Sequence, residues 1–67
     1  MGVVKVIEII AESTESWEDA AQVAVREVSK TVKNIQGVYV KDFQAVVEDN
    51  NVVKYRVNAK ISFLVKE

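Results

Sequence analysis

Hydrophobic and polar residues alternate most regularly in residues 53–65. Every odd-numbered residue there is apolar, and the residues between them are polar until Leu64 breaks the alternation. A period of two is typical of a β-strand with one buried and one exposed face. At about 3.4 Å per residue, such a strand is roughly 40 Å long. We therefore expect the rest of the chain to supply neighbouring strands and a cover for the apolar face.

Two further segments have the composition of strands. Residues 3–11 are rich in β-branched side chains, and because apolar residues fall on both faces we expect cover on both sides. In residues 38–48 one face is expected to hold Tyr39, Phe43, Ala45 and Val47. The opposite face is expected to hold Val40, Asp42, Gln44 and Glu48. The polar residues 48–51 predict a tight turn, and hence an antiparallel hairpin with residues 53–65.

A helix is expected between the first two strands. Apolar residues recur at helical spacing from Trp17 onward, and small alanines on that side let the helix lie close to a sheet. Ser16, followed three residues later by Asp19, is a capping-box-like start, and we expect the helix to end near Asn34. The order β-α-β-β predicts an α+β fold, with a three-stranded antiparallel sheet wrapped around one helix. Residues 1–67 are expected to form a single domain.

The size and composition of the chain favour self-association. A chain of 67 residues hides only about 60% of the surface that its unfolded form exposes, so its stability margin is small. The sequence contains no Cys and no His, which excludes disulfides and Cys/His zinc sites as supplements. Yet 49% of the residues are apolar, more than one small core can absorb. We expect copies of the chain to cover one another.

The charge pattern excludes several classes of partner. Nine basic and ten acidic residues give a net charge of −1, without the basic stripe typical of nucleic-acid binding. No apolar run approaches the roughly 18 residues of a membrane span, and no signal peptide is visible. We therefore expect a cytoplasmic protein that binds neither nucleic acid nor membrane.

The residues available for chemistry argue against an enzyme. Without Cys or His, the usual nucleophile and base pairs cannot form, and the two glycines provide no phosphate-binding or EF-hand spacing. Trp17, Tyr39 and Tyr55 are interpreted as core residues. Arg56, on the polar face of the long strand, has two interpretations: a solvent-facing side chain with its stem on the sheet, or a contact to an anion or aromatic ring.

Several motifs together resemble those of the dodecin family. They are Lys-Val-Ile-Glu-Ile at residues 5–9, Ser-Thr at 13–14 followed by Ser-Trp-Glu-Asp-Ala-Ala at 16–21, Lys-Thr-Val-Lys-Asn-Ile at 30–35, and Tyr-Arg-Val at 55–57 leading to Phe63. The resemblance covers essentially the whole chain. It implies a sheet wrapped around one helix and twelve copies in a hollow sphere. It also implies binding rather than catalysis, because many dodecins stack flavins between tryptophans and store or quench them.

The chain departs from the flavin-binding dodecins at positions that the resemblance assigns to the ligand. Gly37 stands where those members carry the stacking tryptophan, and Arg56 replaces a glutamine that hydrogen-bonds the flavin. Gln44 completes the ligand-binding positions that the family implies. An aromatic platform contributes about 1 kcal/mol beyond the area it buries, so its loss counts against high-affinity flavin binding in the usual mode.

A subset of dodecins that lacks this tryptophan and has Tyr-Arg in the last strand binds calcium, and this chain resembles that subset more closely. Calcium takes about six to eight oxygen ligands, more than the scattered acids of one chain supply locally. Symmetry-related copies would complete such a site, with Glu8, Glu48 and Asp49 as candidate ligands and magnesium as an alternative cation.

The leading hypothesis is a non-catalytic homododecameric shell that stores, sequesters or buffers a small ligand or cation. Two alternatives stay open. One is storage and quenching of riboflavin or FMN, as in typical dodecins. The other is a purely structural or partner-binding shell.

Overall fold

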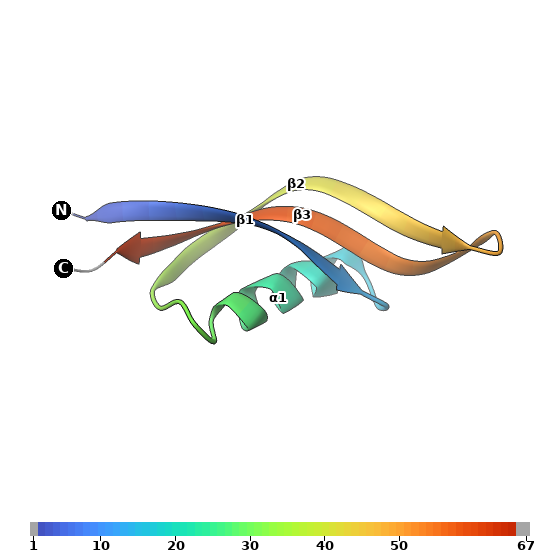
Figure 1. Ribbon diagram of the computed structural model, residues 1–67, viewed down its shortest axis with the longest axis horizontal. Coiled ribbons are helices and arrows are strands. Elements are labelled where there is room, and N and C mark those ends of the chain that lie inside the picture. The colour runs from blue at the N-terminus through green and yellow to red at the C-terminus, as the bar shows by residue number, and fades with distance from the viewer. Residues whose placement is uncertain (1, 66–67) are drawn as a thin grey trace.

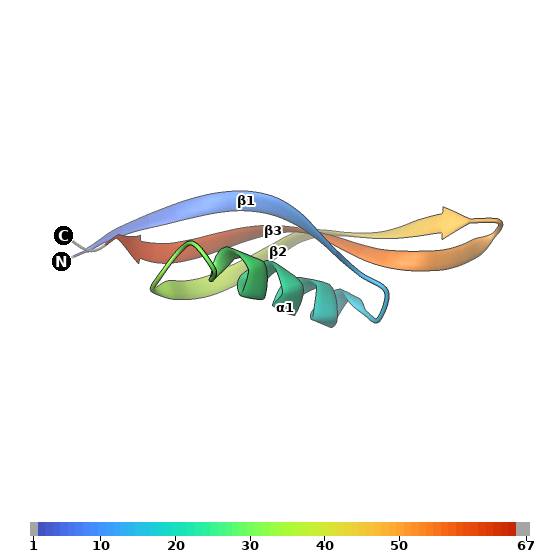
Figure 2. The same cartoon turned by 60° about the horizontal axis from the view of Figure 1, so that its bottom comes forward.

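The computed structural model describes residues 2–65 and contains four elements: β1 (Val3–Ser13), α1 (Trp17–Val28), β2 (Ile35–Glu48) and β3 (Asn51–Val65). The strands form one antiparallel sheet in the order β1-β3-β2. The helix lies along one face of this sheet, and the β2–β3 hairpin extends beyond the helix (Figures 1 and 2). The predicted β-α-β-β fold is confirmed.

The alternation in β3 determines the core, because β3 is the central strand. Val57, Ala59 and Ile61 all lie on the side facing α1 and are fully buried. Among the described residues the buried apolar set is completed by Ala11, Ala20 and Ala24. Four of these six residues are alanines, so the helix approaches the sheet closely and the enclosed core is small.

The helix begins where the sequence indicates and ends earlier than expected. The Ser16 hydroxyl accepts a hydrogen bond from the Asp19 N–H at 2.9 Å, which caps the first turn. The helix ends at Val28 rather than near Asn34. Asn34 has a φ of 65°, a left-handed conformation that an α-helix does not contain, and β2 then begins at Ile35 instead of residue 38.

A bulge in β2 changes which residues share a face. The pairing with β3 shifts between Val40 and Asp42, so that Lys41 is the extra residue. As a result Val40 packs against the core, whereas Tyr39 is 66% exposed on the face turned away from α1. The expectations that Tyr39 shares a face with Phe43 and belongs to the core were wrong, because the alternation resumes in the opposite phase after a bulge.

The outer face, defined as the face of the sheet turned away from α1, keeps many apolar side chains in solvent. In β1 these are Val4, Val6 and Ile10, between 50% and 64% exposed. Their neighbours Ile7 and Ile9 pack against the core on the helix side. The chain therefore covers only one of the two apolar faces of β1.

No helix among residues 2–65 is long and apolar enough to cross a membrane.

We predict that Ala24→Leu destabilises the fold. Ala24 is 1% exposed between α1 and the sheet, and a larger side chain there forces the two apart at a cost of about 1–3 kcal/mol. Gln22→Leu, which adds the same side chain on the exposed side of α1, is the matched control. Urea unfolding at one fixed protein concentration measures both. Equal midpoints for the two variants would contradict the close packing.

Candidate functional site on the outer face

Two adjacent rows of residues cross the outer face of the sheet, and all of them except Ile10 are polar. One row consists of Glu12, Arg56 and Gln44, and the next of Ile10, Asn58 and Asp42. Even-numbered residues of β3 point outward because its odd-numbered residues face the helix. The bulge at Lys41 is what sets Asp42 opposite Asn58 on this face.

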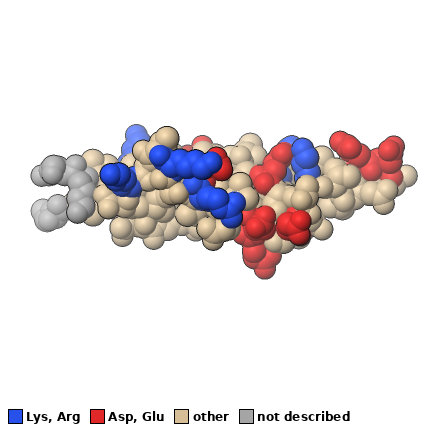
Figure 3. Space-filling view, turned by 90° about the horizontal axis from the view of Figure 1, so that it is seen from below, with Lys and Arg blue, Asp and Glu red and all other residues tan. Residues whose placement is uncertain are grey.

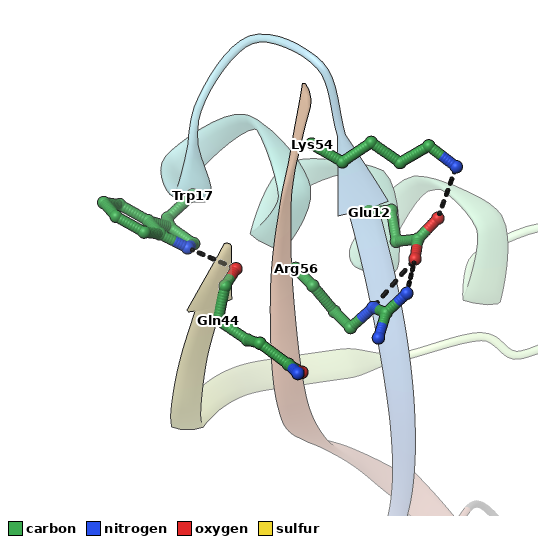
Figure 4. A network of polar contacts seen from close by, with 5 residues as sticks. All are labelled: Glu12, Trp17, Gln44, Lys54 and Arg56. Atoms are coloured by element: carbon green, nitrogen blue, oxygen red, sulfur yellow. Dashed lines mark hydrogen bonds and ion pairs between the residues drawn. The ribbon is translucent and has the colours of Figure 1, made fainter. Parts of the chain in front are cut away.

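Arg56 is held by an ion pair from β3 to the edge strand β1. Its Nε donates to Glu12 Oε2 at 2.8 Å, and its Nη2 donates to the same oxygen. Lys54 Nζ approaches the other carboxylate oxygen at 3.5 Å (Figure 4). The side chains of Glu12 and Arg56 are 34% and 33% exposed, so the pair is partly shielded from solvent. Arg56 is thus bound to a partner within the chain, and its contact to an anion or aromatic ring in an assembly stays a prediction.

The basic neighbours change the acidity of Glu12. Hydrogen bonding from Arg56 lowers the pKa of Glu12 below its ordinary value of 4.5, and the positive charge of Lys54 acts in the same direction. Partial desolvation of the carboxylate opposes this shift without cancelling it. Glu12 therefore stays ionised, and paired with Arg56, at lower pH than an isolated glutamate.

Beside this pair lies a hollow of about 280 Å³, lined by Ile10, Asp42, Phe43, Gln44, Arg56 and Asn58. The side-chain oxygen Oδ1 of Asn58 is buried and has no hydrogen-bond donor among residues 2–65. Within the same residues no basic group lies within 4.0 Å of Asp42. By contrast Glu8, on the same face, forms an ion pair with Lys41, with 3.6 Å between Glu8 Oε2 and Lys41 Nζ. The hollow thus combines an unpaired carboxylate with an unpartnered amide oxygen.

Trp17 lies away from this hollow. Its Nε1 donates to the backbone oxygen of Gln44 at 3.1 Å, and Figure 4 shows it to one side and the Glu12–Arg56 pair to the other. Its ring packs edge-on against Phe43 and Tyr55, with centroids 5.9 and 5.0 Å apart. Trp17 is half-buried against the core, so its role is in packing the helix on the sheet.

The structure brings together two of the three predicted ligand-binding residues. Gln44 and Arg56 are direct partners in the sheet, whereas Gly37 lies opposite Ser62, farther along β2. Gly37 borders a separate surface hollow with Tyr39. A Cβ added to Gly37 would meet only the Ser62 hydroxyl, at 3.6 Å, so this part of the outer face is open.

The three candidate metal ligands are not brought together in one chain. Glu48 and Asp49 lie at the β2–β3 turn, at the far tip of the hairpin, while Glu8 lies in β1 (Figure 1). Figure 3 shows acidic side chains gathered toward the hairpin end and basic ones toward the other end. Within the part of the chain that the structure describes, no group of three His, Cys, Asp or Glu residues could hold a metal ion.

Sequence reasoning missed Glu12, Asp42 and Asn58 as members of the site. The sequence predicts a first strand over residues 3–11, whereas β1 continues to Ser13 and places Glu12 in the sheet. Counting back from the turn at residues 48–51 pairs Gln44 with Tyr55, and the register shift between Val46 and Val47 is what sets Gln44 opposite Arg56. Neither this shift nor the bulge at Lys41, which sets Asp42 opposite Asn58, has a clear sequence signature.

The Dodecin family model matches residues 3–66. The chain belongs to the dodecin family. A calcium dodecin from Mycobacterium tuberculosis is 36% identical over 63 residues, which cover 94% of this chain and 89% of that protein. The crystal structure of the calcium-chelating calcium dodecin from that organism matches with a TM-score of 0.84 at 34% identity, covering 96% and 91% of the two chains. A Thermus thermophilus dodecin variant matches with a TM-score of 0.93 at 27% identity over the full length of both chains.

We predict that Glu12 contributes to the acid sensitivity of this dodecin. Because its pKa is lowered in the folded state, its ion pair stabilises the fold above pH 4.5, and this stabilisation is lost as the pH falls below that value. Between neutral pH and about pH 3, the urea midpoint of Glu12→Gln should therefore fall less than that of the wild type. Glu15→Gln, on an exposed glutamate, should follow the wild type. Parallel profiles for all three proteins would contradict the assignment.

Proposed function

We propose that this dodecin is a non-catalytic binding protein that stores or buffers a divalent cation, calcium foremost, at outer-face sites completed by neighbouring copies. The observation that carries the proposal is the unpaired carboxylate of Asp42 beside the unpartnered oxygen of Asn58. Gln44, in the next row, supplies a further amide oxygen. Carboxylate and amide oxygens are the ligands that calcium takes in proteins.

One chain cannot complete such a site. Its three side chains fall short of the roughly six to eight oxygens that calcium coordinates, so the others must come from further copies or from water. The apolar residues on the same face, Ile10 and Tyr39 among them, favour this arrangement because association removes them from water. A dodecameric shell of the kind that the family resemblance implies would bring the copies together.

Association also explains why a cation is needed. Burying the Asp42 carboxylate in an interface without a counter-charge costs several kcal/mol, and a bound cation removes that cost. Calcium is favoured over magnesium because it tolerates irregular coordination, whereas magnesium demands a near-octahedral set. The calcium dodecin relative from Mycobacterium tuberculosis supports the same choice.

Storage of flavin is the weaker candidate. The hollow at Gly37 is open and Tyr39 is exposed beside it, which gives a flat ligand some room. The tryptophan of this chain, however, is engaged with Phe43 and Tyr55 and offers no platform on the outer face. Stoichiometric quenching of riboflavin fluorescence on titration would favour flavin over the cation.

We predict that the purified protein retains calcium and releases it to a chelator, as measured by native mass spectrometry. Asp42→Asn should weaken calcium binding in calorimetry about tenfold or more, because each copy loses a full ligand charge. Glu15→Gln removes the same charge from an exposed residue outside the sheet and should bind as the wild type does. Equal calcium affinity in the two variants would contradict the site. A melting temperature unchanged by calcium, magnesium and flavin would favour a purely structural shell.

A further inference from the structure

We propose that Glu12 sets the charge preference of the hollow at Asp42 and Asn58. By holding Arg56 it leaves the hollow to a cation, and without it the same hollow takes an anion. This inference rests on the proposed function, and it names the residue that selects between classes of ion. Glu12 acts through Arg56 and is therefore a positioning residue.

The guanidinium group of Arg56 is bound on the β1 side of the hollow. Arg56 is the basic residue among those that line the hollow. Its Nε and Nη2 both donate to Glu12 Oε2 on β1 (Figure 4). Asp42 lies on β2, the neighbour on the other side of β3. Among the described residues, Glu12 is the carboxylate with which Arg56 forms an ion pair. The positive charge nearest the hollow is thus neutralised from the β1 side.

Without Glu12, the guanidinium has a second acid within reach. Arg56 lies opposite Gln44 and Asp42 lies opposite Asn58, so Arg56 and Asp42 are diagonal neighbours across β2 and β3. Diagonal positions on one face are about 7–8 Å apart, a distance that an arginine side chain spans. A released Arg56 would therefore neutralise Asp42 and place its remaining N–H donors in the hollow, where an oxyanion could accept them.

Removing Glu12 changes the net charge of the groups at the hollow from −1 to zero. With Glu12 present, the pair is neutral and Asp42 leaves the hollow with one negative charge. With Glu12 absent, the charges of Arg56 and Asp42 cancel, and the free donors attract anions rather than cations. Lys54 contacts the other carboxylate oxygen of Glu12 but does not line the hollow.

A purely structural role for Glu12 makes a different prediction. The Glu12–Arg56 pair joins the edge strand β1 to the central strand β3, and such a clamp affects the free energy of unfolding. It does not determine which ion the hollow binds. The choice between cation and anion therefore distinguishes the structural role of Glu12 from its role in positioning Arg56. Recovery of calcium binding when Arg56→Gln is added to Glu12→Gln distinguishes them further.

The test is calorimetric titration of the assembled protein with calcium chloride and, separately, with inorganic phosphate. Glu12→Gln should bind calcium about tenfold or more weakly than the wild type and should gain phosphate binding. Arg56→Gln should bind calcium at least as tightly as the wild type. The double variant Glu12→Gln/Arg56→Gln should recover calcium binding and bind no phosphate, because the released guanidinium is gone. Glu15→Gln, a charge change outside the sheet, should match the wild type.

Wild-type calcium affinity in Glu12→Gln, or equal impairment in the single Glu12→Gln and double variants, would overturn the inference. If the wild type binds no calcium, the proposed function fails, and the phosphate titration alone decides the inference: binding gained by Glu12→Gln supports it, and no gain overturns it. If Glu12→Gln does not fold, the double variant decides, since a calcium affinity more than about tenfold below the wild type would contradict a role exerted through Arg56.

Discussion

The physical constraint on which this structure depends is that one short helix can cover only one face of a sheet with long strands. The sheet strands run for 11 to 15 residues, whereas α1 has 12 residues rising about 1.5 Å each. The buried set is correspondingly small and is mostly alanine. Alanine burial contributes less than the roughly 1.5–3 kcal/mol of a larger apolar side chain, so a single chain has a thin margin of stability.

The outer face has to satisfy two requirements at once. Its apolar residues gain from being covered, but cover also places its polar residues in a medium of low dielectric constant, where an unpaired charge is costly. Two of its acids meet this requirement within the chain, because Glu8 pairs with Lys41 and Glu12 pairs with Arg56. Asp42 has no ion-pair partner and Asn58 Oδ1 has no hydrogen-bond donor among residues 2–65, and the proposed cation site follows from that difference. The ion pairs and the proposed cation would thus satisfy the same constraint.

The sequence was informative where a local pattern decides the structure. The alternation of residues 53–65 correctly placed Val57, Ala59 and Ile61 in the core, and Ser16 correctly began the helix. The sequence was not informative where contacts between distant segments decide the structure. The helix ends early, at Val28, and Lys30 and Thr31 then donate to carbonyls three residues back. The exchange of faces in β2 depends on one bulged residue that alternation cannot reveal. Arg56 was placed on the correct face, but its partner Glu12 lies 44 residues away, and only the register of β1 brings them together.

The proposed site depends on cover of the outer face by other copies of the chain. Size-exclusion chromatography with light scattering tests it most directly, on the wild type and on Ile10→Lys, which places a charge on the exposed apolar part of that face. We expect the wild type to elute as an assembly of about twelve 7.5 kDa chains, and Ile10→Lys to elute at a lower mass. A wild-type monomer of 7.5 kDa at micromolar concentration would contradict the account.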